Sequence, residues 1–413
     1  MFLDLILCVL GLAILVYAAD KLVESASNLA LNFGVSKMVI GLTIVAAGTS
    51  LPEFVVSLNS SIKGNAALSL GNVVGSNIMN IALILGITAL ILPINGTKEM
   101  VKREVPIMIA VTALVWIFAK TDFIISPSEG LILLAIFIVY NVLSYVIGKR
   151  EAKLAEEYEA EANQYIMLKK KKVANSNKAS GEDKSEKVSN ENEAAKTENN
   201  ANASDEAKTE SESKDSKEEQ PPSIGVNLLW IAGGLVGMVI GSELLVRSAV
   251  SIATALGVSN EVIGLTLVAI GTSLPELATS VVAAKKGQSD LSVGNVLGSN
   301  IFNITAIVST AAIVPYFTSA GASSLYLRVS EEMLTLHIPI MMVVAIILLP
   351  IMITDMKISR KEGAFFLAIY LCYTIMLVQS AVKPNKPEEK QVNTIQENSI
   401  AVPASSTLNL KTN

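Results

Sequence analysis

Apolar stretches of transmembrane length recur along the whole chain, and they constrain its fold more than any other feature. A helix needs about 20 consecutive apolar residues to cross the hydrocarbon core of a bilayer. The chain is 51% hydrophobic with a mean hydropathy of +0.51, which is too apolar for a soluble domain of this size. We therefore predict an all-α membrane protein with ten transmembrane helices. The predicted spans are Phe2–Ala19, Met38–Ser61, Leu68–Leu92, Val105–Ala119, Gly130–Ile147, Val226–Val246, Val262–Ala284, Leu291–Val314, Leu336–Ile353 and Gly363–Ala381.

A long polar segment separates the first five spans from the last five. From Lys169 to Pro222 the only large apolar side chains are Val173 and Val188. Such a segment cannot bury enough apolar surface to offset the entropy lost on ordering, so we expect it to be disordered. The predicted organisation is a five-helix unit over 1–150, a disordered linker over 151–223, a second five-helix unit over 224–382 and a disordered polar tail over 383–413.

The two apolar halves repeat one another in sequence. Ile40–Ile81 matches Ile263–Ile304 at a constant offset of 223 residues, and more than half of the paired positions are identical. Because each half has an odd number of spans, the second half must enter the membrane from the opposite side. Duplicated halves of inverted topology are typical of secondary transporters, whose binding site lies at the repeat interface near the membrane midplane. We predict two inverted five-helix repeats.

The distribution of lysine and arginine between the predicted loops indicates the orientation in the membrane. Loops on the cytoplasmic side of a membrane protein carry an excess of these residues. The richer side contains Lys21, Lys37, Lys98, Lys102, Arg103, Lys149, Arg150, Lys285, Lys286, Lys357, Arg360 and Lys361. We therefore predict a multi-pass protein of the cell membrane with the long linker in the cytoplasm and both termini outside.

Two glutamates lie in the middle of predicted spans. Glu53 ends the motif Gly-Thr-Ser-Leu-Pro-Glu in the second span, and Glu276 ends an identical motif in the seventh. A charge at the centre of a membrane helix costs about 2.5–3.5 kcal/mol on insertion scales. A carboxylate that only stabilises helix packing is the alternative, but the cost recurs at equivalent positions of the repeat. The pattern favours a functional site.

The residues around each glutamate are suited to binding a hard cation. Thr49 and Ser50 precede Glu53 by four and three residues, so on a continuous helix all three share one face. Pro52 lacks an N–H and clashes with the preceding turn, which is expected to free carbonyl groups near Ala46–Thr49. Pro275 should have the same effect near Ala269–Thr272. Carboxylate, hydroxyl and carbonyl oxygens suit sodium or calcium rather than zinc or copper.

A second repeated motif occupies the following span of each half. Gly71-Asn72-x-x-Gly75-Ser76-Asn77-x-x-Asn80 recurs from Gly294 to Asn303. Asn72, Ser76 and Asn80 fall four residues apart and form a polar stripe on one helix face. The glycine pair should let another helix approach closely. The amides are either ion ligands or hydrogen-bonding groups that only hold helices together, and both interpretations stay open for Asn72 and Asn295.

These two motifs, each present twice, resemble the calcium/cation antiporter family, specifically the prokaryotic sodium/calcium exchangers. The resemblance covers both halves and implies four ion sites arranged as a diamond, with calcium in one or more and sodium in the others. The ligands it implies are Ala46, Thr49, Ser50, Glu53, Ser76, Asn80, Ala269, Thr272, Ser273, Glu276, Ser299 and Asn303. Asn303 departs from the family, because well-studied members often have Asp at that position, and this bears on any role in proton binding.

The predicted function is sodium/calcium antiport by alternating access. The expected partners are calcium and sodium ions and the lipid bilayer, with no cofactor, nucleic acid or protein partner. A proton-coupled or potassium-dependent exchanger on the same fold is the nearest alternative. A cation channel is less consistent with the sequence, because channels usually place symmetric subunits around a pore. An enzyme is also disfavoured, since the sequence contains no nucleophile–base pair or cofactor motif.

Overall fold

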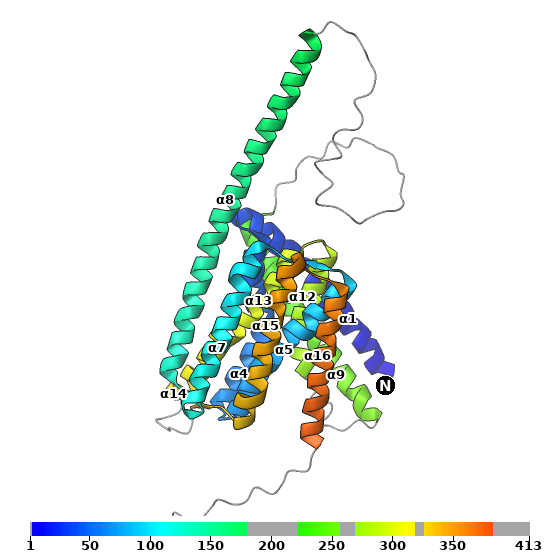
Figure 1. Cartoon of the computed structure of the whole chain (residues 1–413). Helices are drawn as coiled ribbons and strands as arrows, with labels where there is room; N and C mark the ends of the chain where they lie inside the picture. The colour runs from blue at the N-terminus through cyan, green and yellow to red at the C-terminus, as the bar shows by residue number, and fades with distance from the viewer. Residues whose placement is uncertain (1, 180–221, 257–268, 319–325, 383–413) are drawn as a thin grey trace, which may run out of the picture.

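The computed structural model describes residues 2–179, 222–256, 269–318 and 326–382, and they form an elongated helical bundle (Figure 1). In the first half the elements are α1 (Phe2–Phe33), α2 (Lys37–Ile40), η1 (Gly41–Val45), α3 (Ala46–Thr49), α4 (Leu51–Ile62), α5 (Ala66–Met79), η2 (Asn80–Leu85), α6 (Gly86–Ile91), β1 (Ile94–Asn95), η3 (Met100–Glu104), α7 (Val105–Asp122), β2 (Ile124–Ile125) and α8 (Pro127–Ala179). In the second half they are α9 (Ile224–Ala255), α11 (Ala269–Thr272), α12 (Leu274–Lys285), α13 (Ser289–Phe302), η5 (Asn303–Ile307), α14 (Val308–Thr318), β3 (Leu327–Arg328), η7 (Met333–His337), α15 (Ile338–Asp355), β4 (Lys357–Ile358) and α16 (Arg360–Val382).

The helices confirm the membrane character of the chain but not the full count of spans. Within the described ranges eight helical segments are long and apolar enough to cross a bilayer. A ninth candidate joins Lys37–Thr49 to Leu51–Ile62 through a bend of 49°. The predicted span Val262–Ala284 lies partly outside the described residues, and its described end forms α11 and α12. Ten spans in two inverted repeats therefore stay a prediction.

The linker prediction is wrong over its first part. Helix α8 does not end at the membrane but continues to Ala179 as one helix of 53 residues, which projects far beyond the bundle (Figure 1). Residues 151–168 are rich in alanine and glutamate, which are strong helix formers and need no buried face to form a helix. Lys153 and Glu157 also form a favourable pair one turn apart, at 3.8 Å. Residues 180–221 of the predicted linker and the tail from 383 lie outside the described residues.

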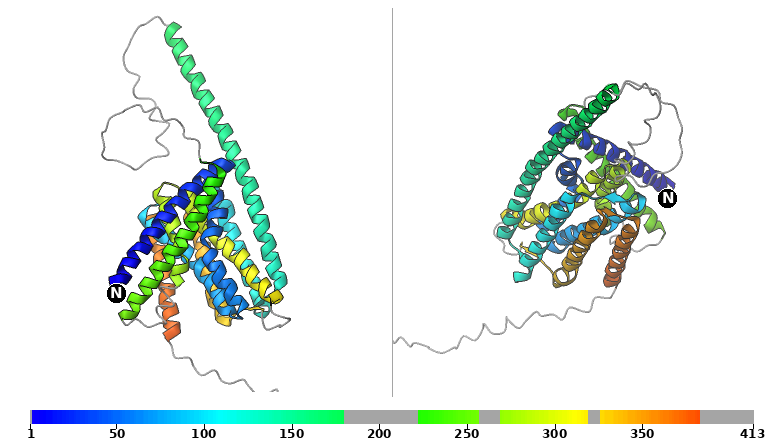
Figure 2. Two further views of the ribbon diagram at one scale, coloured as in Figure 1. Left: turned by 180° about the vertical axis from the view of Figure 1, so that it is seen from behind. Right: turned by 45° about the horizontal axis from the view of Figure 1, so that its top comes forward.

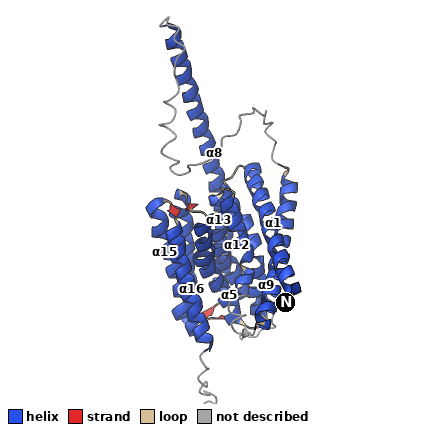
Figure 3. Cartoon of the chain, turned by 90° about the vertical axis from the view of Figure 1, so that its right-hand side faces the viewer, coloured by secondary structure: helices blue, strands red, loops and turns tan. Residues whose placement is uncertain are grey.

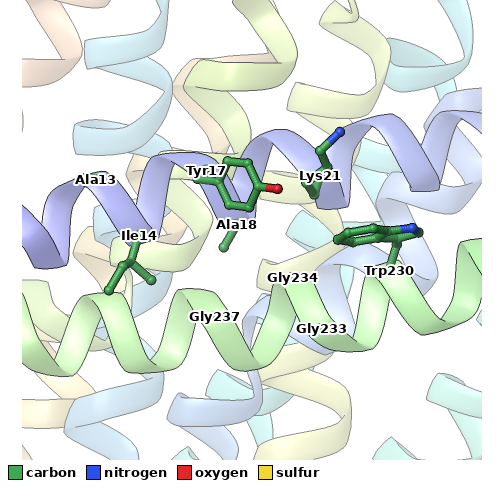
Figure 4. A pocket seen from close by; sticks show the side chains of 9 residues that line it. All are labelled: Ala13, Ile14, Tyr17, Ala18, Lys21, Trp230, Gly233, Gly234 and Gly237. Atoms are coloured by element: carbon green, nitrogen blue, oxygen red, sulfur yellow. The ribbon is translucent and has the colours of Figure 1, made fainter.

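Helices α1 and α9 run antiparallel and pack tightly along much of their length (Figure 2). A Cβ built on Gly11 would lie 2.7 Å from the backbone nitrogen of Leu245, and one on Gly241 would lie 2.7 Å from that of Leu15. The glycines therefore allow direct contact between the two backbones. Near Trp230 the interface opens into a shallow hollow, where the Lys21 ammonium lies 5.8 Å from the indole centroid (Figure 4). This hollow contains none of the repeated motif residues.

Replacing Gly241 with alanine should lower the thermal stability of the protein. The new methyl group would meet backbone atoms that cannot rotate away, and overpacking of this kind costs about 1–3 kcal/mol. Gly233 lies on the same helix with open space around its Cβ position, so Gly233→Ala is the matched control and should leave the melting temperature near that of wild type. Equal melting temperatures for the two variants would contradict the close approach of α1 and α9.

The described elements of the two halves follow the same order beyond the repeated motifs. Strand β1 pairs with β4, and β2 pairs with β3, so each short antiparallel sheet takes one strand from each half. The two sheets lie at opposite ends of the bundle (Figure 3). Helices α7 and α15 are both 18 residues long, and each ends at a residue with positive φ, Phe123 and Met356. Helices α5 and α13, one from each half, carry the polar motifs and contact each other through Asn77 and Asn300.

Candidate functional site

A break in the helix places Glu53. Helix α3 ends at Thr49, and α4 begins at Leu51 with Pro52 in its first turn, so the missing N–H of proline costs no helical hydrogen bond. Glu53 lies in the first turn of α4, where the helix dipole stabilises a negative charge. Pro275 and Glu276 take the same places at the start of α12. Both glutamates are only 1% exposed.

The helix break also shows that the geometry predicted for the first motif is wrong. Thr49, Ser50 and Glu53 do not share one face of a continuous helix, because Ser50 lies at the bend. The Ala46 carbonyl is not free either, since it accepts the Ser50 N–H at 3.0 Å. A carbonyl oxygen has two lone pairs, so one acceptor position of the Ala46 carbonyl stays available, and Ala46 stays a predicted ligand.

Each glutamate accepts a hydrogen bond from the other half of the protein. The Ser273 hydroxyl donates to Glu53 Oε1 at 2.9 Å, and the Ser50 hydroxyl donates to Glu276 Oε1 at 3.0 Å. The second carboxylate oxygen, Oε2, has no hydrogen-bond partner in either glutamate although it is buried. Buried carboxylate oxygens without partners are costly, and a bound cation would supply the missing interaction.

Three further oxygens of the predicted ligand set are buried without partners. They are Oδ1 of Asn80, Oδ1 of Asn303 and Oγ of Ser299. Asn80 and Asn303 each stand at the first residue of a π-helical segment, η2 and η5, a local widening that often occurs at functional sites. The unsatisfied amide atoms are the oxygens, so the site is arranged to accept from, or to coordinate, a positively charged group.

The other predicted ligands lie around this centre with different environments. The Thr49 hydroxyl donates to Asn295 Oδ1 at 3.2 Å. Ser76 is buried, whereas Thr272 is half-buried. Ala269 is the first residue of α11. Across the described ranges, no group of three or more histidine, cysteine, aspartate or glutamate side chains could hold a metal. The predicted donor set consists of two carboxylates and neutral oxygens, which suits sodium or calcium.

A small cavity reaches this site from the side of α16. Its volume is about 70 Å³, and it is lined on the α5 side by Asn72, Ser76 and neighbouring glycines and on the α16 side by Tyr370, Tyr373 and Thr374. Among the described residues, no atom lies within 4 Å of a Cβ built on Gly75. The close helix approach predicted for the glycine pairs is thus absent at Gly75. It is present at Gly298, whose Cβ would lie 2.5 Å from the Leu42 carbonyl oxygen.

The family model for the sodium/calcium exchanger protein matches residues 3–146 and 226–379, which include every element of the site. The chain belongs to the sodium/calcium exchanger family. It is therefore a multi-pass membrane transporter and not an enzyme, and its family supports cation antiport.

Named relatives of this exchanger cover nearly its whole length. It is 33% identical over 380 residues to the putative antiporter CaxA of Alkalimonas amylolytica, which spans 91% of this chain and 98% of the relative. It is 34% identical over 379 residues to the sodium/calcium exchanger MaX1 of Methanosarcina acetivorans, with the same two coverages. A solved structure of the sodium-calcium exchanger NCX_Mj superposes with a TM-score of 0.65 at 28% identity and covers 91% of this chain and 99% of its own.

Two asparagines that were left out of the predicted ligand set join the two halves of the candidate site. Asn77 and Asn300 are buried and hydrogen-bond to Asn303 and Asn80 respectively. Both occur in the repeated motif, so their identity in the two halves was the available signal. Asn72 and Asn295 fit the structural alternative, because each donates to the backbone carbonyl of the glutamate in its own half, at 3.1 and 3.4 Å.

Proposed function

We propose that this protein is a sodium/calcium antiporter, which moves calcium across the membrane in exchange for sodium. The observation that carries the proposal is the pair of buried glutamates, each with one carboxylate oxygen free of any hydrogen bond. Two negative charges balance one calcium ion, and sodium ions can replace it at the same oxygens. The name of one relative, a sodium/calcium exchanger, supports the same cargo, and the name of another, a putative antiporter, supports exchange.

The proposed ion ligands centre on the unsatisfied oxygens. Glu53 and Glu276 would supply the charge, and Asn80, Asn303 and Ser299 would supply neutral oxygens. The remaining positions of the predicted set, including Ser76 and Thr272, would complete the neighbouring sodium sites. All of these are hard oxygen donors, and calcium takes six to eight of them in flexible geometry.

Alternating access by two inverted repeats is the proposed mechanism. In its support, α1 and α9, the first helices of the two halves, run antiparallel. The hydrogen bonds of the site also occur in exchanged pairs, such as Ser50 with Glu276 and Ser273 with Glu53. Two halves with the same fold in opposite orientations can open the same site to each side of the membrane in turn. We further propose that the linker faces the cytoplasm and that both termini lie outside, as the positive-inside rule indicates.

Calcium uptake into sodium-loaded vesicles tests the function. The purified protein is reconstituted into liposomes loaded with sodium chloride and diluted into choline medium containing radioactive calcium. Uptake should occur, and it should stop when the internal sodium is replaced by choline. Uptake that continues without sodium and is driven by a proton or potassium gradient would contradict the proposal and assign the alternative coupling ion. Protein-free liposomes provide the baseline.

A further inference from the structure

Four asparagines form a connected hydrogen-bonded group between the two halves of the site. Asn77 and Asn80 come from α5 and η2, and Asn300 and Asn303 come from α13 and η5. All four are at most 1% exposed. The amide nitrogen of Asn77 donates to the backbone carbonyl of Asn300 at 3.2 Å, and that of Asn300 donates to the Asn77 carbonyl at 3.3 Å.

These backbone carbonyls determine which way every amide of the group is turned. A carbonyl oxygen can only accept, so the atom of Asn77 that faces it must be the amide nitrogen. The Asn77 side-chain oxygen is then the acceptor that faces Asn303, whose nitrogen donates at 3.0 Å. By the same reasoning Asn80 donates its nitrogen to Asn300 Oδ1 at 2.9 Å. The side-chain oxygens of Asn80 and Asn303 are left buried without partners.

We propose that Asn77 and Asn300 are positioning residues that hold Asn303 and Asn80 with their amide oxygens turned toward the transported ions. The inference rests on the proposed function, because it assumes that Asn80 and Asn303 contact the cargo. An amide rotated by half a turn would present its NH₂ group, whose hydrogens carry partial positive charge, to a cation. Asn77 and Asn300 prevent this rotation, because an amide of Asn303 or Asn80 turned the other way would place its oxygen against the side-chain oxygen of Asn77 or Asn300.

The hydrogen bond from Asn303 to Asn77 also accounts for the residue type at position 303. An ionised carboxylate there could not donate to Asn77 Oδ1, and two acceptor oxygens would face each other in a buried site. The amide of Asn303 is therefore matched to Asn77, as that of Asn80 is matched to Asn300. Neutral ligands at both positions leave Glu53 and Glu276 as the carboxylates among the proposed ligands.

The variants Asn77→Ala and Asn300→Ala test the positioning role by calcium transport kinetics. Each should raise the KM for calcium about tenfold, because a misdirected ligand amide weakens binding by the equivalent of one good hydrogen bond. Thr112→Val is the control, since it removes a buried hydroxyl that bonds only to the Met108 carbonyl of its own helix, at 2.8 Å. Its KM should be that of wild type. If the Asn77→Ala protein is not recovered, Asn77→Ser is used in its place, because the shorter serine side chain cannot reach Asn303.

A double-mutant cycle separates positioning from general stability. In an Asn303→Ala background the Asn77→Ala change should alter the calcium KM less than twofold, because the amide it orients is already missing. A purely structural role would instead lower the amount of active protein in both backgrounds at unchanged KM, and that result would overturn the inference. Wild type without sodium-dependent calcium uptake would refute the proposed function, whereas wild-type KM in both alanine variants would refute only the positioning role.

Discussion

Glu53→Gln and Glu276→Gln should each abolish calcium transport while the protein still inserts into the membrane. The charge is the first reason: at an effective dielectric constant of about 20, two unit charges about 4 Å apart interact by about 4 kcal/mol. The second is geometry. Ser273 would donate to the oxygen of the new amide, which leaves an NH₂ group where Glu53 Oε2 was free. Because 1.4 kcal/mol is tenfold, a loss of about a hundredfold or more in calcium affinity is expected.

The measurement is sodium-dependent calcium uptake into liposomes, normalised to the amount of reconstituted protein. Glu243→Gln is the matched control, because it also removes one negative charge but lies in an exposed pair with Arg247 on α9. Its uptake should equal that of wild type. If either the Glu53 or the Glu276 variant transported calcium near the wild-type rate, the ion site would have to lie elsewhere.

Glu104→Ala should be among the most destabilising substitutions outside the ion site. The Glu104 side chain is fully buried, and its two oxygens contact the Arg103 guanidinium at 2.6 Å and the Tyr140 hydroxyl at 2.7 Å. Glu104→Ala removes both of these hydrogen bonds, and a hydrogen bond to a charged group contributes about 1.5–3 kcal/mol. Arg103 would retain its contact with Glu151 of α8, at 3.1 Å.

Thermal unfolding in detergent measures this effect. The control is Glu24→Ala, which removes the acid from the Lys21–Glu24 pair, whose side chains are 31% and 51% exposed. Exposed pairs contribute about 0–1 kcal/mol, so this variant should melt near wild type. Tyr140→Phe should have an intermediate effect, because it removes one hydrogen bond and keeps the ion pair. A Glu104→Ala protein as stable as the Glu24→Ala protein would show that the buried pair adds nothing.

Helix α8 illustrates why the linker was only partly predictable. Its polar composition between 151 and 179 argues against a buried core, and the structure places no packed domain there. Low hydrophobicity, however, excludes only tertiary burial and not helix formation. Residues with high helix propensity that follow a membrane helix can extend it, because the nucleation cost has already been met by the preceding turns. A prediction based on apolar content alone missed this continuation.

The correspondence between the halves also extends further than the sequence revealed. Tyr140 hydrogen-bonds to Glu104, and Tyr373 lies 3.2 Å from Nδ1 of His337 in the matching position of the second half. Glutamate and histidine are different residue types, so a comparison of residue identities between the two halves does not pair them. The structural equivalence follows from helix lengths and turns, which different residues can produce.

The sequence alone determined the membrane character, the repeat and the two glutamates, because each of these depends on a local cost or a local identity. An apolar stretch of bilayer length predicts a transmembrane helix, and a charge in its middle predicts a functional site, whatever the rest of the chain contains. Tertiary structure decided which atoms of the site are free. Ser50 bonds to the glutamate of the other half and Asn77 to Asn303, both across 226 residues. These contacts depend on how the helices of one half pack against those of the other. A buried polar atom is available to an ion only when no such neighbour has already satisfied it.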